Sequence, residues 1–260
     1  MNILERLANS ARSRVKQAKE SLSTEGIKDK AYYAKKGEFE FENALKKPGL
    51  SFICECKKAS PSKGIIAPKF PYLKIAEEYE KAGADAISVL TEPTEFLGND
   101  KYLAEIAQSV NLPCLRKDFI IDEYMIYEAK ILGAKAFLLI VSLLSEDELK
   151  SYIKIGESLG MSVLVETRDE NEIKRAVDAG ARIIGVNNRN LKDFSVDVTH
   201  SAKLIELIPK NTLFVAESGI KTSSDVKKMR DIGADAVLIG EALMLSEDKS
   251  AKLKELKGEI

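Results

Sequence analysis

The sequence predicts a (β/α)8 barrel of the TIM type, as one domain over residues 1–260 with an N-terminal helical extension over residues 1–50. The first observation behind this fold class is a set of eight short apolar runs, each followed by a helical pattern. The second is a recurring Gly-Ala phrase, and the third is the length of 260 residues, close to the ~250 of one barrel domain. An open doubly wound sheet is the main alternative, because it also alternates strands with helices.

The extension is predicted to begin with an amphipathic helix. One helical face carries Leu4, Leu7, Ala8, Ala11, Val15 and Ala18. We expect this face to pack on the barrel rather than on a membrane surface, because it lacks bulky aromatic anchors and acidic residues offset its basic ones. Phe39, Phe41 and Leu45 predict a second docking segment before the first strand.

The eight predicted strands are rich in Val, Ile and Leu, as strands buried on both faces are. In chain order they are Phe52–Lys57, Ala86–Leu90, Pro113–Phe119, Ala136–Val141, Ser162–Glu166, Ile183–Val186, Leu213–Glu217 and Ala236–Ile239. Gly83, Gly133, Gly180 and Gly233 each stand between a helical stretch and a strand, 50, 47 and 53 residues apart. They predict left-handed helix caps, and a repeat of two strand–helix units near 50 residues favours the barrel.

The composition indicates a soluble globular protein. Its 40 basic and 41 acidic residues give a net charge of −1, with 45% hydrophobic and 31% charged residues. Without a basic excess, we expect no nucleic-acid or membrane partner. The longest apolar stretch, near Ala136–Leu144, is too short for a membrane span, and Met1–Val15 is too charged for a signal peptide. We therefore expect a cytoplasmic protein.

The cysteines and the single histidine argue against several classes of site. Cys54, Cys56 and Cys114 cannot complete a disulfide framework, and a C-x-C pair alone makes a poor zinc site, so buried strand positions are expected. His200 starts a predicted helix, away from any strand end, which disfavours a Ser-His-Asp or Cys-His site. There is no G-x-G-x-x-G or Walker A sequence.

Charged and amide side chains end several predicted strands, where barrel enzymes carry their chemistry. Alternation along a strand puts Glu55 and Lys57 on one face and both neighbouring cysteines on the other. The same alternation groups Lys117 with Phe119, and Asn187 with Arg189, while Glu166 ends the fifth strand. These residue types predict general acid–base catalysis by Lys and Glu, without metal or redox cofactor. A Schiff base on a lumen lysine stays open.

Small residues after the last two strands predict a phosphate site. Ser218-Gly219 and Gly240-Glu241 stand where barrel enzymes often hold phosphate on loop amides. The segment Ser60–Gly64 after the first strand is either a mobile loop with turn residues or a lid that contacts an anion.

Four segments together resemble the indole-3-glycerol phosphate synthase family of tryptophan biosynthesis. They are Glu55–Gly64 (ECKKASPSKG), Leu115–Ile120 (LRKDFI), Gly185–Leu191 (GVNNRNL) and Ala216–Ile220 (AESGI). The resemblance runs in order from the N-terminal helix to Gly240–Met244, and no second barrel follows residue 260, so the single-function form is implied.

The resemblance implies a lyase that closes the ring of 1-(2-carboxyphenylamino)-1-deoxyribulose 5-phosphate, losing carbon dioxide and water to give indole-3-glycerol phosphate. It implies that Lys117 protonates the ketone oxygen and that Glu166 steadies the cationic amine side. Glu55 and Lys57 would serve the later dehydration, with Lys57 also a candidate partner of the substrate carboxylate. Which lysine acts at which step stays open.

The remaining site residues also follow from the resemblance. Those implied to complete the site or bind substrate are Ser60, Phe119, Asn187, Arg189, Leu191, Ser218, Gly219, Gly240 and Glu241. The backbone amide of Glu241 is expected to bind phosphate while its side chain points away. A monomer or weak homodimer is expected.

Two rival functions are kept. One is the sugar-phosphate isomerase acting just upstream, which needs a Cys/Asp pair, and so requires Cys54 or Cys56 to face the lumen. The other is a non-catalytic phosphate-binding barrel. Against it, the lumen carries more ionisable residues than a pure binder needs, namely Glu55, Lys57, Lys117 and Glu166.

Overall fold

The computed structural model contains a closed barrel of eight parallel strands, so the predicted fold class is confirmed and the open sheet is excluded. The structure describes residues 3–189 and 195–259. Around the barrel the order is β1-β10-β9-β8-β7-β6-β5-β4, with β1 pairing both β4 and β10. The barrel strands are β1 (Ser51–Cys56), β4 (Ala86–Leu90), β5 (Cys114–Lys117), β6 (Ala136–Ile140), β7 (Ser162–Thr167), β8 (Ile183–Asn187), β9 (Leu213–Glu217) and β10 (Ala236–Ile239). A separate antiparallel ribbon pairs β2 (Ala59–Ser60) with β3 (Gly64–Ile65).

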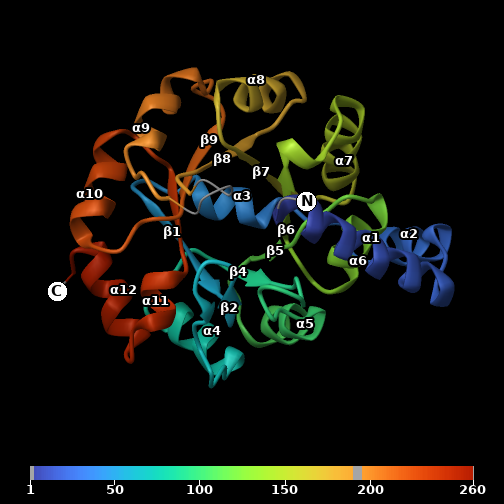
Figure 1. Ribbon diagram of the computed structural model, residues 1–260, viewed down its shortest axis with the longest axis horizontal. Helices are drawn as coiled ribbons and strands as arrows, with labels where there is room; N and C mark the ends of the chain where they lie inside the picture. Colours follow the sequence, from blue (N-terminus) through green and yellow to red (C-terminus); the bar gives the residue numbers. More distant parts are fainter. Residues whose placement is uncertain (1–2, 190–194, 260) are drawn as a thin grey trace.

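The helices surround the strands as a ring (Figure 1). Those of the barrel are α4 (Tyr72–Lys81), α5 (Asp100–Ser109), α6 (Glu123–Ile131), α7 (Glu146–Ser158), α8 (Glu170–Asp178), α9 (His200–Leu204), α10 (Ser223–Asp231), α11 (Glu241–Leu245) and α12 (Lys249–Lys257), with 3-10 turns η1 (Val141–Leu143) and η2 (Ile205–Leu207). Within the described residues, no helix is long and apolar enough to cross a membrane.

The predicted glycine caps are confirmed. Gly83, Gly133, Gly180 and Gly233 have φ angles of 78°, 89°, 86° and 84°, in the left-handed region that side chains avoid. Each follows the last turn of a helix and redirects the chain into the next strand. The same geometry of the connection therefore recurs at every second strand–helix unit.

Alternate strand residues build two apolar layers. Residues such as Ile53, Leu115 and Leu164 belong to the cluster inside the barrel. Cys54 and Cys56 belong to the cluster between strands and helices, and both are fully buried, as predicted. Period-two alternation separates these cysteines from Glu55, so neither supplies the lumen thiol that the isomerase reading requires.

The N-terminal extension packs on both ends of the barrel. Helix α1 (Ile3–Ser21) buries Leu7, Ala8, Ala11 and Val15 as predicted, and its first turn lies near the middle of the barrel (Figure 1). Helix α3 (Glu40–Leu45) places Phe41 and Leu45 in the interior cluster with residues that begin strands, such as Ala136. Helix α2 (Thr24–Tyr33) lacks a predicted counterpart.

Two strands are shorter than predicted. Strand β5 ends at Lys117 because the carboxylate of Asp118 accepts the backbone N–H of Phe119, at 2.8 Å, in place of a ladder bond. Strand β6 ends at Ile140, where the chain turns through η1. Asp118, Phe119 and Val141 therefore lie in the segments that follow these strands, at the C-terminal end of the barrel, while Pro113 precedes β5.

Candidate active site

A pocket at the C-terminal ends of the strands gathers the residues that the sequence singled out. Its lining includes Glu55, Lys57, Ser60, Lys117, Phe119, Glu166, Asn187, Arg189, Ser218, Gly219, Gly240 and Glu241. Leu191 lies outside the described residues. These side chains come from strands that are far apart in sequence, and closure of the barrel brings them to one opening.

Lys117 of β5 lies beside the acidic side chains of β7 and β9. Its Nζ lies 3.3 Å from Glu166 Oε2 and 3.6 Å from Glu217 Oε2. Burial lowers the pKa of Lys117, but the charges of Glu166, Glu217 and Glu55 outweigh burial and raise the pKa far above its ordinary value. The side chain is therefore an ammonium group at any physiological pH, with a fixed place in the pocket.

Glu217 is a site residue to which the sequence analysis gave no role. Burial, together with the charges of Glu166 and Glu55, raises its pKa to about 8 against the pull of Lys117. Among the residues that the structure describes, its buried Oε1 has no hydrogen-bond partner. The available signal was its position, since Glu217 ends β9 as Glu166 nearly ends β7, inside an apolar strand.

Glu55 and Lys57 form a second ion pair in the pocket, with Lys57 Nζ 2.5 Å from Glu55 Oε1. Burial raises the pKa of Glu55, but the charges of Lys57 and Lys117 reverse the effect and hold it below the ordinary value. The pair is nearly enclosed, because the Lys57 side chain is 16% exposed and the Glu55 side chain 5%. At neutral pH, Glu55 is therefore a carboxylate that can accept a proton.

Two glycines make room for the acidic side chains. A methyl group on Gly185 would overlap Oε1 of Glu217, and one on Gly240 would overlap Oε1 of Glu55. Close packing of a carboxylate against a neighbouring strand requires the absence of a side chain there. The absence of a side chain at Gly240 therefore leaves space for Glu55, which pairs with Lys57.

Asn187 links Glu166 to the next loop. Its Nδ2 donates to Glu166 Oε1 at 3.1 Å, and its Oδ1 accepts the backbone N–H of Arg189 at 3.0 Å. The following Asn188 donates to the carbonyl of Ser218, at 3.2 Å, and accepts from Ser201. One strand end therefore fixes both the carboxylate beside Lys117 and the turn at Ser218.

The turn after β9 has the backbone of an anion-binding loop. Ser218 and Gly219 both have positive φ angles, 67° and 82°. Successive residues of this kind can present backbone N–H groups to one ligand. A methyl group on Gly219 would overlap Val196, so the turn requires glycine for space as well as for conformation.

The carboxylate of Glu241 does not point away from the site, contrary to expectation. It lies 3.3 Å from Arg189 Nη2, 3.4 Å from Lys221 Nζ and 3.9 Å from Lys63 Nζ. Burial raises its pKa, but these three cations lower the pKa below the ordinary value. Three basic side chains therefore converge on one anion at the pocket mouth. Lys63 belongs to the turn of the β2–β3 ribbon, and so the Ser60–Gly64 segment joins this charged cluster.

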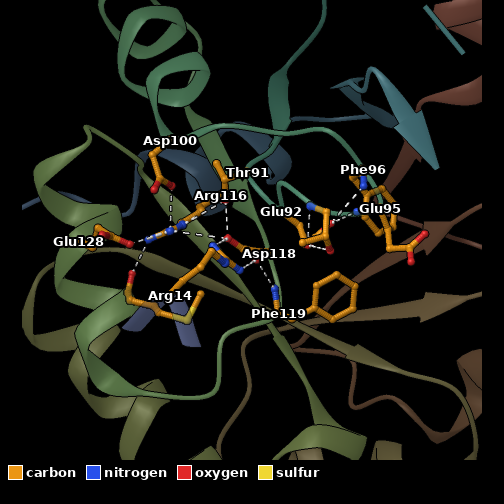
Figure 2. A network of polar contacts seen from close by, with 12 residues as sticks. Arg14, Thr91, Glu92, Glu95, Phe96, Asp100, Arg116, Asp118, Phe119 and Glu128 are labelled. Atoms are coloured by element: carbon orange, nitrogen blue, oxygen red, sulfur yellow. Dashed lines mark hydrogen bonds and ion pairs between the residues drawn. The ribbon is translucent and has the colours of Figure 1, made fainter. Parts of the chain in front are cut away.

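The opposite wall of the pocket is apolar. Leu4 and Leu7 of α1, Phe96, Phe119 and Leu138 contribute to it, and the two phenyl rings are 6.0 Å apart. The buried carboxylate of Glu92 holds the loop that carries Phe96 by accepting three consecutive backbone N–H groups, from residues 94–96 (Figure 2). Sequence reasoning missed Phe96 because nothing local marks a loop residue as facing the lumen.

The single histidine does not line this pocket. His200 begins α9, and its Nε2 lies 2.6 Å from the carbonyl of Arg168. Across residues 3–189 and 195–259, no group of three or more His, Cys, Asp and Glu side chains is arranged to hold a metal ion. The pocket itself combines Lys57 and Lys117, the acidic side chains beside them, a cationic mouth and an aromatic wall. Such a site suits an aromatic, phosphorylated substrate whose reaction moves protons.

Comparison with known proteins agrees with the geometry. The family model described as indole-3-glycerol phosphate synthase matches residues 4–256. Proteins of that name from Ruminiclostridium cellulolyticum and Endomicrobium trichonymphae are 55% and 52% identical to this chain, over 98% of it and 99% of their own lengths. Among solved structures, 3-hexulose-6-phosphate synthase from Salmonella typhimurium aligns with a TM-score of 0.65 and 14% identity, covering 80% of this chain and 97% of its own. That likeness shows the fold alone.

Proposed function

Because the chain belongs to the indole-3-glycerol phosphate synthase family, we propose that its pocket closes the indole ring of 1-(2-carboxyphenylamino)-1-deoxyribulose 5-phosphate. The family consists of carboxy-lyases of tryptophan biosynthesis, and the chain is an enzyme of that class. The observation that carries the proposal is the convergence of Lys117, Lys57 and their carboxylates opposite an apolar wall.

Lys117 acts in the ring closure. The ring carbon that bears the carboxylate attacks the ketone carbon, a carbon–carbon bond forms, and the electrons of the carbonyl move to its oxygen. The ammonium of Lys117 stabilises that oxygen and donates a proton to it. A raised lysine pKa does not prevent this transfer, because an alkoxide is more basic than an amine. Carbon dioxide then leaves, and the electrons of its bond restore the aromatic ring.

Glu166 supports the cationic nitrogen that develops during the attack. Its carboxylate is already oriented by two donors, Lys117 at 3.3 Å and Asn187 at 3.1 Å. A group fixed before the reaction does not have to reorganise as charge develops. Asn187 therefore contributes by orienting Glu166, and Glu217 contributes by holding Lys117 from the other side.

Glu55 and Lys57 perform the dehydration. Lys57 donates a proton to the departing hydroxyl group, and Glu55 accepts a proton from the neighbouring carbon, so that water leaves and the double bond forms. Their separation of 2.5 Å keeps an acid and a base together before the step. Before closure, Lys57 is also placed to pair with the substrate carboxylate.

The substrate's ends are bound at opposite sides of the pocket. Phosphate lies against the Ser218-Gly219 turn and Gly240, with Arg189, Lys221 and Lys63 as cations. Ser60 lines the same side. The aromatic ring lies against Phe96 and Phe119. We further propose a cytoplasmic enzyme that is a monomer or a weak homodimer.

Indole fluorescence tests the proposal directly, because the chain contains no tryptophan. Purified protein mixed with the carboxyphenylamino-deoxyribulose phosphate is expected to develop indole fluorescence, while release of carbon dioxide is followed in parallel. Lys117→Ala is expected to lose both signals, and Lys57→Ala to retain carbon dioxide release but lose the fluorescence. Lys74→Ala is the control, because that lysine side chain is 74% exposed and pairs with Glu78 of its own helix.

Different outcomes identify different errors. Failure of the wild-type chain to produce either signal would sink the proposed activity. Retention of more than about a tenth of the wild-type kcat by Lys117→Ala would remove it as general acid, since such catalysis is worth ~10²-fold or more. Loss of carbon dioxide release in Lys57→Ala would instead assign that lysine to the ring closure.

A further inference from the structure

The residues on either side of Lys117 carry charges that face away from the lumen. Arg116 and Asp118 flank Lys117 in sequence, and both of their side chains are 0% exposed. Because strand residues alternate in direction, Lys117 points into the pocket while its two neighbours point into the helical layer. Both neighbours of the proposed general acid therefore belong to a buried ion network, which Figure 2 shows.

Arg116 fixes the strand to the helices outside it. Its guanidinium lies 2.9 Å from Asp100 of α5 and 2.7 Å from Glu128 of α6, and it donates to the carbonyl of Met125 at 2.9 Å. Burial lowers the pKa of Arg116, but these acidic neighbours raise it above the ordinary value. The arginine is charged, and its outward contacts hold the end of β5 in place.

Asp118 connects the same strand end to the N-terminal extension. Its two carboxylate oxygens accept from Arg14 Nη1 and Nη2 at 3.0 and 2.8 Å. They also accept from Thr91 Oγ1 at 2.7 Å and from the backbone N–H of Phe119. Burial raises the pKa of Asp118, but Arg14 and Arg116 lower it below the ordinary value, so the group is ionised.

Helix α1 carries both this anchor and part of the pocket wall. Arg14 and Leu7 are seven residues apart, about two helical turns, and so they share the face turned to the barrel. Leu7 and Leu4 line the pocket with Phe119, the residue after Asp118. The distance from the apolar wall to the Lys117 ammonium therefore depends on the geometry of the ion pair between Arg14 and Asp118.

We propose that Asp118 and Arg14 are positioning residues for the proposed ring closure. Their bidentate pair sets the α1 wall against the aromatic ring of the substrate, at the distance from Lys117 that the attack requires. The inference rests on the proposed function and extends it to Arg14, which does not line the pocket, and to Asp118, whose side chain is fully buried. A displacement of one wall by about 1 Å is enough to reduce a rate by ~10²-fold when reacting atoms must be aligned.

The chain offers a matched control on the same helix. Lys19 of α1 pairs with Asp122 at 2.7 Å, and Asp122 also belongs to the loop after β5. That pair is 36% and 28% exposed and lies farther from the pocket-lining end of the helix, whereas Arg14 is 25% exposed and Asp118 fully buried. Loss of the Lys19 pair removes a tie between the same two elements without touching the wall.

The experiment uses Arg14→Met, Arg14→Lys, Asp118→Asn, the Arg14→Met/Asp118→Asn double variant and Lys19→Met in the full chain. Turnover is followed by indole fluorescence, and the Kd of inorganic phosphate is followed by calorimetry. We expect kcat to fall at least tenfold in Arg14→Met and Asp118→Asn, while the Kd of phosphate changes less than twofold. The double variant is expected to be no slower than the worse single variant, Arg14→Lys to recover part of the loss, and Lys19→Met to match the wild type.

Three results would overturn the proposal. The first is a kcat within twofold of wild type in Arg14→Met. The second is a double variant whose loss equals the product of the single losses. The third is a parallel loss of phosphate binding, which would indicate general damage. A wild-type chain without any turnover would refute the proposed function itself. This failure is distinguishable from a failure of the positioning proposal, because it is seen in the wild type without any variant.

Discussion

The raised pKa of Glu217 predicts that this carboxylate makes the protein less stable as pH rises. Burial and the nearby acidic charges move the pKa from 4.5 to about 8 in the folded chain. Between these two values the folded state retains a proton that the unfolded chain has released. Stability therefore falls with rising pH across that interval, and is unaffected by this group below pH 4.5. The perturbation that removes the effect is Glu217→Gln, which keeps the shape and removes the titration.

The expected magnitude follows from the two pKa values. Each pH unit within the interval changes the free energy of unfolding by up to about 1.4 kcal/mol. From pH 6 to pH 8 the change is about 2 kcal/mol, because the group is half ionised at the upper end. Between pH 6 and pH 8, the free energy of unfolding of Glu217→Gln should therefore rise by about 2 kcal/mol relative to that of the wild type. This change does not depend on how far the two proteins differ in stability at pH 6.

Urea unfolding of both proteins at pH 6, 7 and 8 measures this difference. Other titrating groups are common to the two chains and cancel. Glu241→Gln is the matched control, since the lowered pKa of Glu241 places its titration below the range and its difference from wild type should stay constant. A Glu217→Gln difference that also stays constant from pH 6 to pH 8 would refute a protonated Glu217.

Three further substitutions test the pocket. Arg189→Lys should raise KM about tenfold with little change in kcat, because lysine cannot pair as a planar fork; an unchanged KM would remove Arg189 from the binding groups. Glu241→Gln should lower the Kd of inorganic phosphate severalfold in calorimetry, because it removes a negative charge from among Arg189, Lys221 and Lys63. Weaker phosphate binding would show instead that Glu241 organises those cations. Gly240→Ala should reduce kcat at least tenfold and lower stability by about 1–3 kcal/mol in urea unfolding, because the methyl group displaces Glu55; wild-type turnover would contradict that packing.

The fold could be predicted because its determinants are local. Gly83 and its three equivalents mark helix ends by a backbone conformation that few residues adopt, and the apolar runs mark the strands. Helix α2 was missed because only Ile27 and Ala31 are buried, which leaves a weak periodic pattern. The β2–β3 ribbon was missed because its strands are two residues long and no hydrophobic alternation can be recognised at that length.

The candidate site was predictable where alternation along one strand was sufficient. Glu55 with Lys57, and Asn187 with Arg189, lie together as two-residue spacing indicates. The orientation of Glu241 depends instead on Lys63 and Lys221, which reach it from other loops. No local pattern encodes a meeting of three loops, so a prediction based on the segment alone placed the carboxylate on the wrong side.

Strand β5 shows that charged residues next to each other in a sequence can lie on opposite faces of a strand and have different roles. Arg116, Lys117 and Asp118 look like one polar patch in the sequence, yet the pleat sends the middle residue into the lumen and the outer two into the helical layer. In the lumen, a cation surrounded by acidic groups stays charged and available to the substrate. In the helical layer, the same kinds of charge are fully paired and fix backbone position. The two roles depend on each other, because an ammonium on a flexible side chain is only as well placed as the strand end that carries it.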